Sequence, residues 1–532
     1  MDTKCTQINI LMANNVKILF FFIIFTRILK LTFNQTMKKL FKGVIAPIFS
    51  FHFSGSKLLK TISNLILFIL FLNGNIQGQP TEKKIKELET LSKSKSPTEA
   101  LSSEKALIEK QYLDKARKNI EQFRKSDASI SFIDAAGKPV NNVQVEINQV
   151  SQDFLFGNLA FEIAGFAPKE SYKEDEFKEK YKALFNFAIL PFYWNGYEKS
   201  AGNPEWKKNE NAINWCLNNG ITCKGHPLGW TGPSGTPKWL LNLPEETATE
   251  LYKARIYNNV IGYKGRINYW DVVNEPVNTV PWDIAFKDKE NSNDLRYNVK
   301  DVSINQIAPW VEQSFKWAYN ANPEAHYILN EFCTLAIPEV RTRFYQLIKE
   351  LKNRNTPISG IGIQAHEPRD MWFSPVEMYK TFDLYKEFNL PIHITEFTPQ
   401  SSGKDITGWR TGKWTEETQA EFAVQFYTLA FGYPSIASIT WWGLSDKSIW
   451  LTGGGLLDQD YNPKPVYTQL LKLIKQDWMT KKVKLTTDKK GQASFRGFFG
   501  NYQVTVTQPD GSKKTLDIHL AEKSQNQWKF NL

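Results

Sequence analysis

Eight short runs of β-branched and apolar residues alternate with stretches of helical periodicity through the central part of the chain. Such runs are typical of parallel strands buried on both faces, and the helices between them are the crossovers that parallel strands need. Eight repeats allow the sheet to close, so the sequence predicts an α/β fold, a (β/α)8 TIM barrel. The expected strands are Phe154–Phe161, Ala188–Trp194, Thr222–Trp230, Asn268–Glu275, His326–Phe332, Ile361–His366, Ile392–Phe397 and Ser438–Leu444.

Two of these runs end abruptly in a glutamate. The run YWDVVNEP delivers Glu275, and the run PIHITEF delivers Glu396. In a barrel the carboxyl ends of the strands open into one cleft, so we expect the two side chains to face one another. A pair of carboxyl groups is what acid-assisted cleavage of a glycosidic bond requires. The alternative is that each glutamate only pairs with a surface cation, and the recurrence behind two buried runs argues against it.

Further motifs accompany the two glutamates in a fixed order. They are GHPLGW at 225–230, QAH at 364–366 and WWGLSD at 441–446, beside the runs WDVVNE and HITEF. Together these motifs resemble glycoside hydrolase family 10, the retaining β-1,4-xylanases built on a TIM barrel. The resemblance runs from about Phe154 to Tyr467.

This resemblance implies a role for each matching residue. Glu275 would be the general acid that protonates the leaving oxygen, and Glu396 the nucleophile that attacks the anomeric carbon. Asn274 resembles the asparagine that bonds the sugar 2-hydroxyl, and His366 the histidine that hydrogen-bonds the nucleophile. The remaining implied substrate-binding residues are His226, Trp230, Gln364, Trp442 and Trp450. Tyr193, Trp194 and Trp239 either extend this aromatic platform or pack in the core.

Three positions depart from the family pattern. The Asn-x-x-Lys-Trp run that usually follows strand two is replaced by PFYWNGYE at 191–198, so the sugar contacts there are rebuilt. Thr398 stands where an aspartate commonly supports the histidine, so His366 lacks that partner or takes one from elsewhere. Thr231 follows Trp230 where a histidine is frequent.

The positive charge of the chain is concentrated at its amino terminus. The formal net charge is +11, and residues 1–79 account for +8 of it, which argues against a nucleic-acid partner for the rest. The apolar run Leu65–Leu72 follows Lys57 and Lys60 and is too short to span a bilayer. Lysines followed by a short apolar run are typical of a signal peptide. We therefore expect secretion with cleavage near Gly78; a membrane anchor is the alternative if the leader is uncleaved.

Cysteines and histidines give no sign of a metal or a disulfide scaffold. The chain has four cysteines, one of them in the leader, and its histidines show no metal-ligand spacing. We expect no cofactor and no metal, with a polysaccharide as the partner of a monomer.

Both ends of the chain beyond the expected barrel alternate with period two. We expect a β-hairpin or meander from Ser129–Ile133 and Val143–Ile147. The same alternation is found in Tyr502–Val506 and Leu516–Leu520. Neither piece is long enough for a secure core, so we expect the two ends to meet in one small β-sandwich-like accessory region. The expected divisions are a leader at 1–78, a charged linker and helix at 79–125, a β segment at 126–150, the catalytic barrel at 151–480 and a second β segment at 481–532.

Three functions remain open from the sequence. The first is a secreted endo-acting β-1,4-xylanase. The second is a related retaining β-glycanase with a shifted substrate preference, because Asn-Glu-Pro after strand four is not confined to one family. The third is a carbohydrate-binding barrel without activity, which the presence of both glutamates disfavours.

Overall fold

The computed structural model describes residues 101–532 except 167–172, 288–301 and 509. The expected leader at 1–78 and the first part of the expected linker, up to residue 100, lie outside the described residues. In the described part, none of the helices has the length and apolar character needed to cross a membrane.

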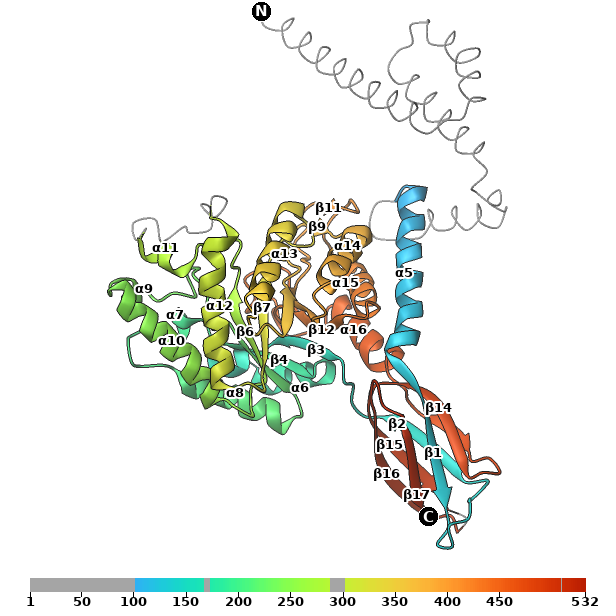
Figure 1. The fold of residues 1–532 in the computed structure, drawn as a ribbon. Coiled ribbons are helices and arrows are strands. Elements are labelled where there is room, and N and C mark those ends of the chain that lie inside the picture. The colour runs from blue at the N-terminus through green and yellow to red at the C-terminus, as the bar shows by residue number, and fades with distance from the viewer. Residues whose placement is uncertain (1–100, 167–172, 288–301, 509) are drawn as a thin grey trace, which may run out of the picture. The chain divides into compact units, whose positions relative to one another are not determined.

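A closed barrel of eight parallel strands forms the centre of the fold, as the sequence predicts (Figure 1). Neighbouring strands follow one another in chain order, and β12 closes the ring against β3, with Ser438 opposite Leu155. The barrel strands are β3 Leu155–Leu159, β4 Phe187–Pro191, β5 Thr222–His226, β6 Tyr269–Asn274, β7 His326–Glu331, β8 Gly360–Ile363, β10 Ile392–Phe397 and β12 Ile436–Trp441.

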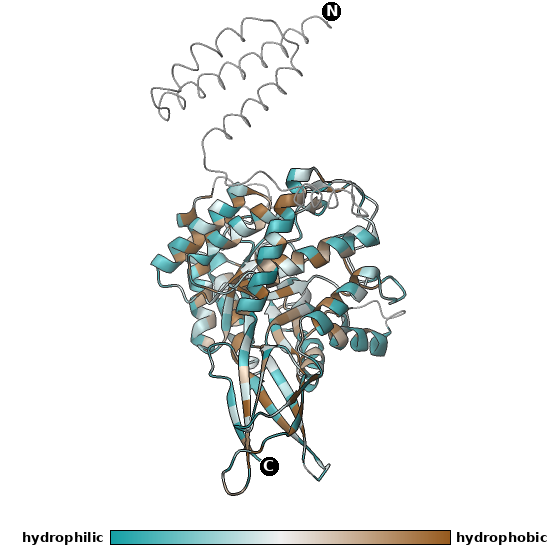
Figure 2. Ribbon diagram, turned by 90° about the vertical axis from the view of Figure 1, so that its right-hand side faces the viewer, coloured by the Kyte–Doolittle hydropathy of each residue, from teal (hydrophilic) through white to brown (hydrophobic). Residues whose placement is uncertain are grey.

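Helices cover the outside of this barrel, and Figure 2 shows hydrophilic residues over much of their surface. They are α6 Glu174–Leu184, α7 Trp194–Tyr197, α8 Trp206–Asn218, α9 Lys238–Leu241, α10 Glu245–Gly262, α11 Trp282–Lys287, α12 Ile304–Ala321, α13 Pro338–Asn353, α14 Pro375–Lys386, α15 Glu416–Phe431 and α16 Pro465–Lys472. Two π-helical turns, η3 Glu162–Phe166 and η5 Leu473–Asp477, and the short paired strands β9 Met371–Trp372 and β11 Thr407–Gly408 complete this part.

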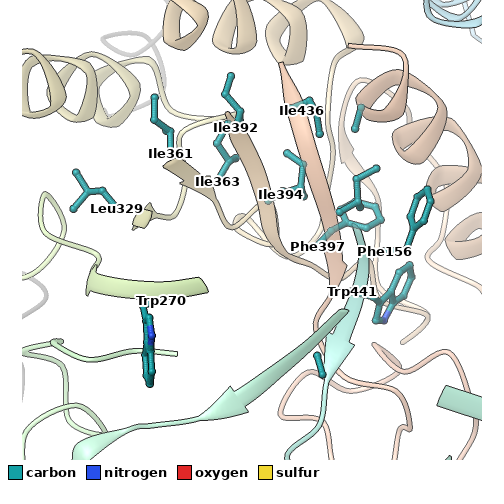
Figure 3. Packing of buried hydrophobic residues seen from close by; sticks show 14 of the residues in the cluster. Phe156, Trp270, Leu329, Ile361, Ile363, Ile392, Ile394, Phe397, Ile436 and Trp441 are labelled. Carbon is teal, nitrogen blue, oxygen red and sulfur yellow. The ribbon is translucent and has the colours of Figure 1, made fainter. Parts of the chain in front are cut away.

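The layer between strands and helices is a large apolar core (Figure 3). Phe397 on β10 stacks on Phe426 of α15, with ring centroids 3.9 Å apart, and meets Trp441 of β12 edge-on at 5.5 Å. Packing aromatic rings of this size between the strands and the helix holds the strand ends in fixed positions. The rim on which Glu396 lies is therefore rigidly supported.

The two ends of the chain form the predicted accessory sandwich. One sheet has the order β14-β1-β17 and the other β13-β2-β15-β16, with a separate apolar core between them. The strands are β1 Lys125–Ile133, β2 Gln144–Gln149, β13 Val483–Thr486, β14 Gln492–Phe498, β15 Gly500–Thr507, β16 Lys513–Leu520 and β17 Gln527–Asn531.

The expected hairpin between the two amino-terminal strands is wrong, because β1 and β2 lie in different sheets. Ile130 of β1 and Ile147 of β2 are both fully buried in the sandwich core. Each strand has only one apolar face, so the two bury more surface by packing face to face than by pairing edge to edge. Their hydrogen-bonding edges are instead filled by carboxy-terminal strands, with β1 pairing β14 and β17 and β2 pairing β13 and β15.

Helix α5 (Ser103–Phe123) leads into the sandwich and is fixed to the barrel by polar contacts. Glu109 forms a buried ion pair with Arg410. Arg124, directly after the helix, donates to the backbone carbonyls of Phe431, Tyr433 and Ile436 at 2.7–2.8 Å. These three carbonyls lie at the end of α15 and the start of β12, so one guanidinium joins the helix to the barrel.

Candidate active site

The nine predicted site residues all lie at or just beyond the carboxyl ends of barrel strands. Asn274 ends β6, and Glu275 follows it. Glu396 is the last residue but one of β10, directly before Phe397. His226 ends β5 and Trp442 directly follows β12. Loops after β5, β8 and β12 carry the others, which are Trp230, Gln364, His366 and Trp450. One rim of the barrel thus presents the whole set.

A continuous chain of hydrogen bonds links the two glutamates. Gln364 Nε2 donates to Glu275 Oε1 at 3.1 Å and approaches Asn274 Oδ1 at 3.3 Å. Asn330 Nδ2 then donates to that same Asn274 oxygen and to Glu396 Oε1, both at 2.8 Å. The two carboxyl groups are therefore held on one network, in which the side-chain oxygen of Asn274 is the shared acceptor.

The backbone beside the acid is bent into an uncommon conformation. Glu275 has a φ of +57°, in the left-handed region that non-glycine residues seldom occupy. Its amide N–H donates to Asn330 O at 2.8 Å, and Trp230 Nε1 donates to its Oε2 at 3.0 Å. Ala365, between Gln364 and His366, has a φ of +60° as well. Such strain is kept where surrounding contacts fix a side chain for a purpose.

Burial governs the charge of the nucleophile candidate. Glu396 is only 4% exposed, and burial together with the nearby Glu275 carboxyl raises its pKa well above the ordinary glutamate value. The hydrogen bond from Asn330 opposes this by stabilising the ionised form. Two carboxyl groups in this setting share one proton more readily than they both ionise.

A third carboxyl group, which is fully buried, adjoins the pair. Glu331 ends β7, and burial, with the charge of Glu275 as a second cause, raises its pKa to about 8. Its oxygens accept from Val277 N at 2.9 Å and from Asn278 Nδ2 at 2.7 Å. These contacts hold the loop that directly follows Glu275, so Glu331 helps to fix the position of that residue.

His226 belongs to a buried polar row that runs down the barrel interior. Its Nδ1 lies 2.7 Å from Asp271 Oδ2, which also receives Lys224 Nζ at 2.7 Å. Burial alone would raise the pKa of Asp271, but Lys224 and His226 outweigh it and lower the pKa, so the carboxylate is charged. At the cleft end, His226 Nε2 lies 3.1 Å from the hydroxyl of Tyr193.

The hydrogen bond predicted from His366 to the nucleophile is absent. His366 Nε2 lies 2.8 Å from Gln364 Oε1 and 3.7 Å from Glu396 Oε2, so its bond goes to the glutamine. Burial lowers the pKa of this histidine to about 3 and keeps the ring neutral. Of the two outcomes expected from Thr398, a lost partner or one taken from elsewhere, the described residues show no hydrogen bond from His366 to a carboxylate, and the Thr398 hydroxyl donates to the backbone oxygen of Glu396. Asn330, not His366, is the donor to the nucleophile candidate.

The two predicted platform tryptophans differ in exposure. Trp442 is 4% exposed and packs edge-on against His226 at 5.1 Å, so it forms a wall. Trp450 is 48% exposed, lies 5.5 Å from the His366 ring and carries the Arg369 guanidinium over its ring at 4.3 Å. Trp450 therefore offers the larger surface to a sugar ring.

Sequence reasoning missed several residues of this network. Asn330 and Glu331 end a predicted strand in the same way as Asn274 and Glu275, and that repeat of a polar pair after an apolar run was the available signal. Lys224 and Asp271 lie within strands, where no sequence pattern distinguishes a functional polar residue from a structural one.

Thr231 has no place in the network, since its hydroxyl donates to Val280 O at 2.7 Å. Among the described residues, no cluster of three or more acidic, histidine or cysteine side chains is arranged to hold a metal ion.

Comparison with known proteins points to one family. The model of glycosyl hydrolase family 10 matches residues 164–473. The chain is 24% identical over 412 residues to the anti-sigma-I factor RsgI6 of Acetivibrio thermocellus, covering 77% of this chain and 48% of that protein. It is 26% identical over 329 residues to endo-1,4-β-xylanase B of Thermotoga neapolitana, covering 59% and 88%.

Among solved structures, native xylanase 10B of Thermotoga maritima is similar, with a TM-score of 0.49 and 23% identity over 61% of this chain and 96% of that one. The chain spans about half or less of the length of several curated relatives that it matches, at 48%, 39% and 38%.

Proposed function

The chain belongs to glycosyl hydrolase family 10, and from that premise we propose that it cleaves internal β-1,4-xylosidic bonds of xylan by a retaining double displacement. The observation that supports the proposal most strongly is the network that joins Glu275 to Glu396 through Gln364, Asn274 and Asn330. It brings two carboxyl groups to one rim, with a hydrogen-bond donor directed at each, which is the arrangement that the proposed acid and nucleophile need.

In the first step Glu275 protonates the glycosidic oxygen while Glu396 attacks the anomeric carbon. The C–O bond to the leaving sugar breaks as a covalent glycosyl-enzyme forms. In the second step Glu275, now ionised, takes a proton from water, and that water releases the sugar from Glu396 with net retention.

The proposed roles set a condition on the charge of the pair. Glu396 accepts a hydrogen bond from Asn330, and Glu275 accepts from Gln364 and from Trp230, so these bonds favour the charged form of both carboxyl groups. The mechanism requires the proton that the pair shares to lie on Glu275 when the glycosidic oxygen binds beside it. As Glu396 becomes esterified its charge disappears, and Glu275 then ionises more readily to act as the base. The reaction therefore moves one negative charge between two prepared positions.

Sugar binding follows from the groups around the pair. The NH₂ group of Asn274 can donate to a sugar hydroxyl, while its oxygen accepts from Asn330 and Gln364. Trp450 offers an apolar face for the C–H side of a sugar ring. A cleft of a few fixed polar groups and one flat ring suits a neutral β-linked chain.

The activity is tested by reducing-sugar release from xylan, β-glucan and mannan. We expect turnover of xylan by the wild type, none by Glu396→Ala, and wild-type turnover by Glu246→Ala, a control glutamate on the exposed surface of α10. Faster turnover of β-glucan or mannan would favour a related β-glycanase, which the replaced Asn-x-x-Lys-Trp run makes the second candidate. Binding of xylan without turnover by the wild type would contradict the proposal and favour a non-catalytic barrel.

The separate roles of the two glutamates are tested by azide rescue with an aryl β-xylobioside. Azide should give Glu275→Ala a β-glycosyl azide, because the glycosyl-enzyme still forms and azide replaces water. It should give Glu396→Ala an α-glycosyl azide, because azide replaces the nucleophile itself. The opposite assignment of products would exchange the roles, and NMR of the first-formed sugar from the wild type measures retention directly.

We also propose that the protein acts outside the cell after cleavage near Gly78. The support is the apolar run Leu65–Leu72 behind Lys57 and Lys60. Amino-terminal sequencing of protein from the culture medium should begin shortly after Gly78, and a chain that retains residue 60 would contradict cleavage.

A further inference from the structure

Tyr193 lies at the carboxyl rim of the barrel, in the stretch 191–198 that replaces the family's usual lysine run. It follows β4 and is half-buried, with its ring edge-on to Trp230 at 5.8 Å and to His226 at 5.2 Å. Trp230 in turn donates to Glu275. Tyr193 therefore contacts His226 directly and is linked to the Glu275 carboxyl group through Trp230.

The direction of the hydrogen bonds in this row is fixed by charge. Asp271 is ionised and can only accept, so the proton of His226 lies on Nδ1. Burial lowers the pKa of His226, which keeps the ring neutral and leaves Nε2 without a proton. The Tyr193 hydroxyl, 3.1 Å away, must then donate to Nε2.

One consequence concerns what Tyr193 can offer to a ligand. Its only proton is committed to His226, so its oxygen can act solely as an acceptor. Burial, followed by the charges of Glu396 and Glu275, raises the pKa of the phenol well above its ordinary value, so the hydroxyl stays protonated. A lysine has the opposite character, with three donors and no acceptor.

We propose that Tyr193 is a specificity-determining residue that accepts a hydrogen bond from one free hydroxyl of the sugar at the cleavage site. This rests on the proposed glycosidase function. The site then selects glycans in which that hydroxyl is unsubstituted, because an ester or ether there has no proton to donate. The side chains of Lys224, Asp271 and His226 are linked in a row, and this row holds the Tyr193 hydroxyl in place.

The test uses aryl β-xylobiosides in which one hydroxyl at a time, on the sugar to be cleaved, is replaced by fluorine. Fluorine cannot donate a hydrogen bond, and its inductive effect on the reaction is common to every enzyme variant. Each substrate is compared with its parent for the wild type, for Tyr193→Phe and for Tyr467→Phe. The last variant is a matched control, because it removes the hydroxyl that donates to Lys180 O at 3.0 Å outside the cleft.

For one fluorinated position, we expect the loss in kcat/KM to be about tenfold smaller in Tyr193→Phe than in the wild type and in Tyr467→Phe. All other positions should show equal losses in the three proteins, and the melting temperatures should agree. A merely structural role would lower every rate alike and leave the ratios unchanged.

Equal losses at every position in the wild type and Tyr193→Phe would overturn the role of Tyr193 while leaving the proposed function intact. The unsubstituted aryl β-glycosides of cellobiose and mannobiose are assayed as well. The fluorinated series is then made from whichever unsubstituted substrate the wild type hydrolyses fastest. If the wild type hydrolyses none of them, the proposed function fails, and the inference about Tyr193 fails with it.

Discussion

The barrel rim and the accessory sandwich bury their residues in opposite ways. The sandwich core consists of apolar side chains that alternate along each strand, such as Ile147 of β2 and Val504 of β15, both fully buried. The rim buries Glu331 and Glu396 and bends the backbone at Glu275 into the left-handed region. Burying carboxyl groups costs free energy, whereas burying isoleucine or valine gains it.

This contrast indicates what each region provides. The sandwich follows the local rules of strand patterning and contributes stability. The rim breaks those rules, and the large core around the barrel offsets the cost. A region that lowers the stability of the fold in this way is expected to do chemistry. Substitutions at the rim should therefore change activity, and substitutions in the sandwich should change stability.

The largest expected effect is the loss of activity in Glu396→Ala. We expect kcat/KM on xylan to fall by a factor on the order of 10⁴ or more, because no other group at the rim can replace the nucleophile. The melting temperature should be unchanged or higher, because a buried carboxyl group with a raised pKa is removed. Xylan assays and thermal unfolding of the same preparation measure both. A clear fall in melting temperature would show that the rim contributes stability after all.

Ile147→Ala should have the reverse effect. Removing this fully buried side chain leaves a cavity in the sandwich, and the free energy of unfolding should fall by about 2–5 kcal/mol. Below the transition, kcat/KM should stay at the wild-type value. Denaturant unfolding and xylan assays decide this, with Val150→Ala, half exposed just beyond the same strand, as the control. An equal loss of stability in the control would mean that burial at Ile147 is not the cause.

The pH dependence of stability should report Glu331. Its folded pKa of about 8 lies above the unfolded value of about 4.3, so between these values only the folded state holds the proton. Unfolding then releases a proton, and this group lowers stability by about 1.4 kcal/mol per pH unit as the pH rises through that window. Glu331→Gln cannot titrate, so its stability should fall less between pH 5 and pH 8, as measured by denaturant unfolding. Parallel pH profiles in the two proteins would exclude a raised pKa at this position.

The smallest expected effect is that of Trp450→Ala. Loss of one exposed aromatic face should raise KM for xylan about two- to tenfold and leave kcat nearly unchanged. Tyr319→Ala, a similarly exposed aromatic on α12, is the control and should not alter KM. Steady-state kinetics distinguish the two, and a fall in kcat alone would place Trp450 in the reaction step instead of in binding.

Local patterns in the sequence were sufficient to locate the barrel strands. All eight expected runs overlap the observed strands, since a buried parallel strand needs a short apolar run whatever its neighbours are. Several expected runs extend too far, as at Trp230, where the loop after β5 stays apolar and Gly229 still bridges to Val273. The same reasoning failed for the expected hairpin, because one apolar face specifies burial but not the partner strand.

In the site, too, the sequence indicated which residues are present but not which of them are in contact. The sequence placed Glu275 and Glu396 at strand ends, and the family resemblance implied a hydrogen bond from His366 to Glu396. That histidine bonds Gln364, and Asn330 from another strand donates to Glu396. Which donor reaches the carboxylate depends on distances that differ by about one ångström, 2.8 Å for Asn330 and 3.7 Å for His366, and no periodicity in the sequence encodes them.

By itself, the sequence of this protein determined the eightfold alternation, the two strand-ending glutamates and the apolar faces of the terminal segments. These are local properties, set by how each residue partitions between water and a packed interior. Only the tertiary structure decided that β1 and β2 face each other from separate sheets, that Glu331 supports the acid loop, and that Tyr193 completes the row of His226. Those relations join residues distant in the chain, and they exist only once the barrel has closed and charge and burial act at the same point.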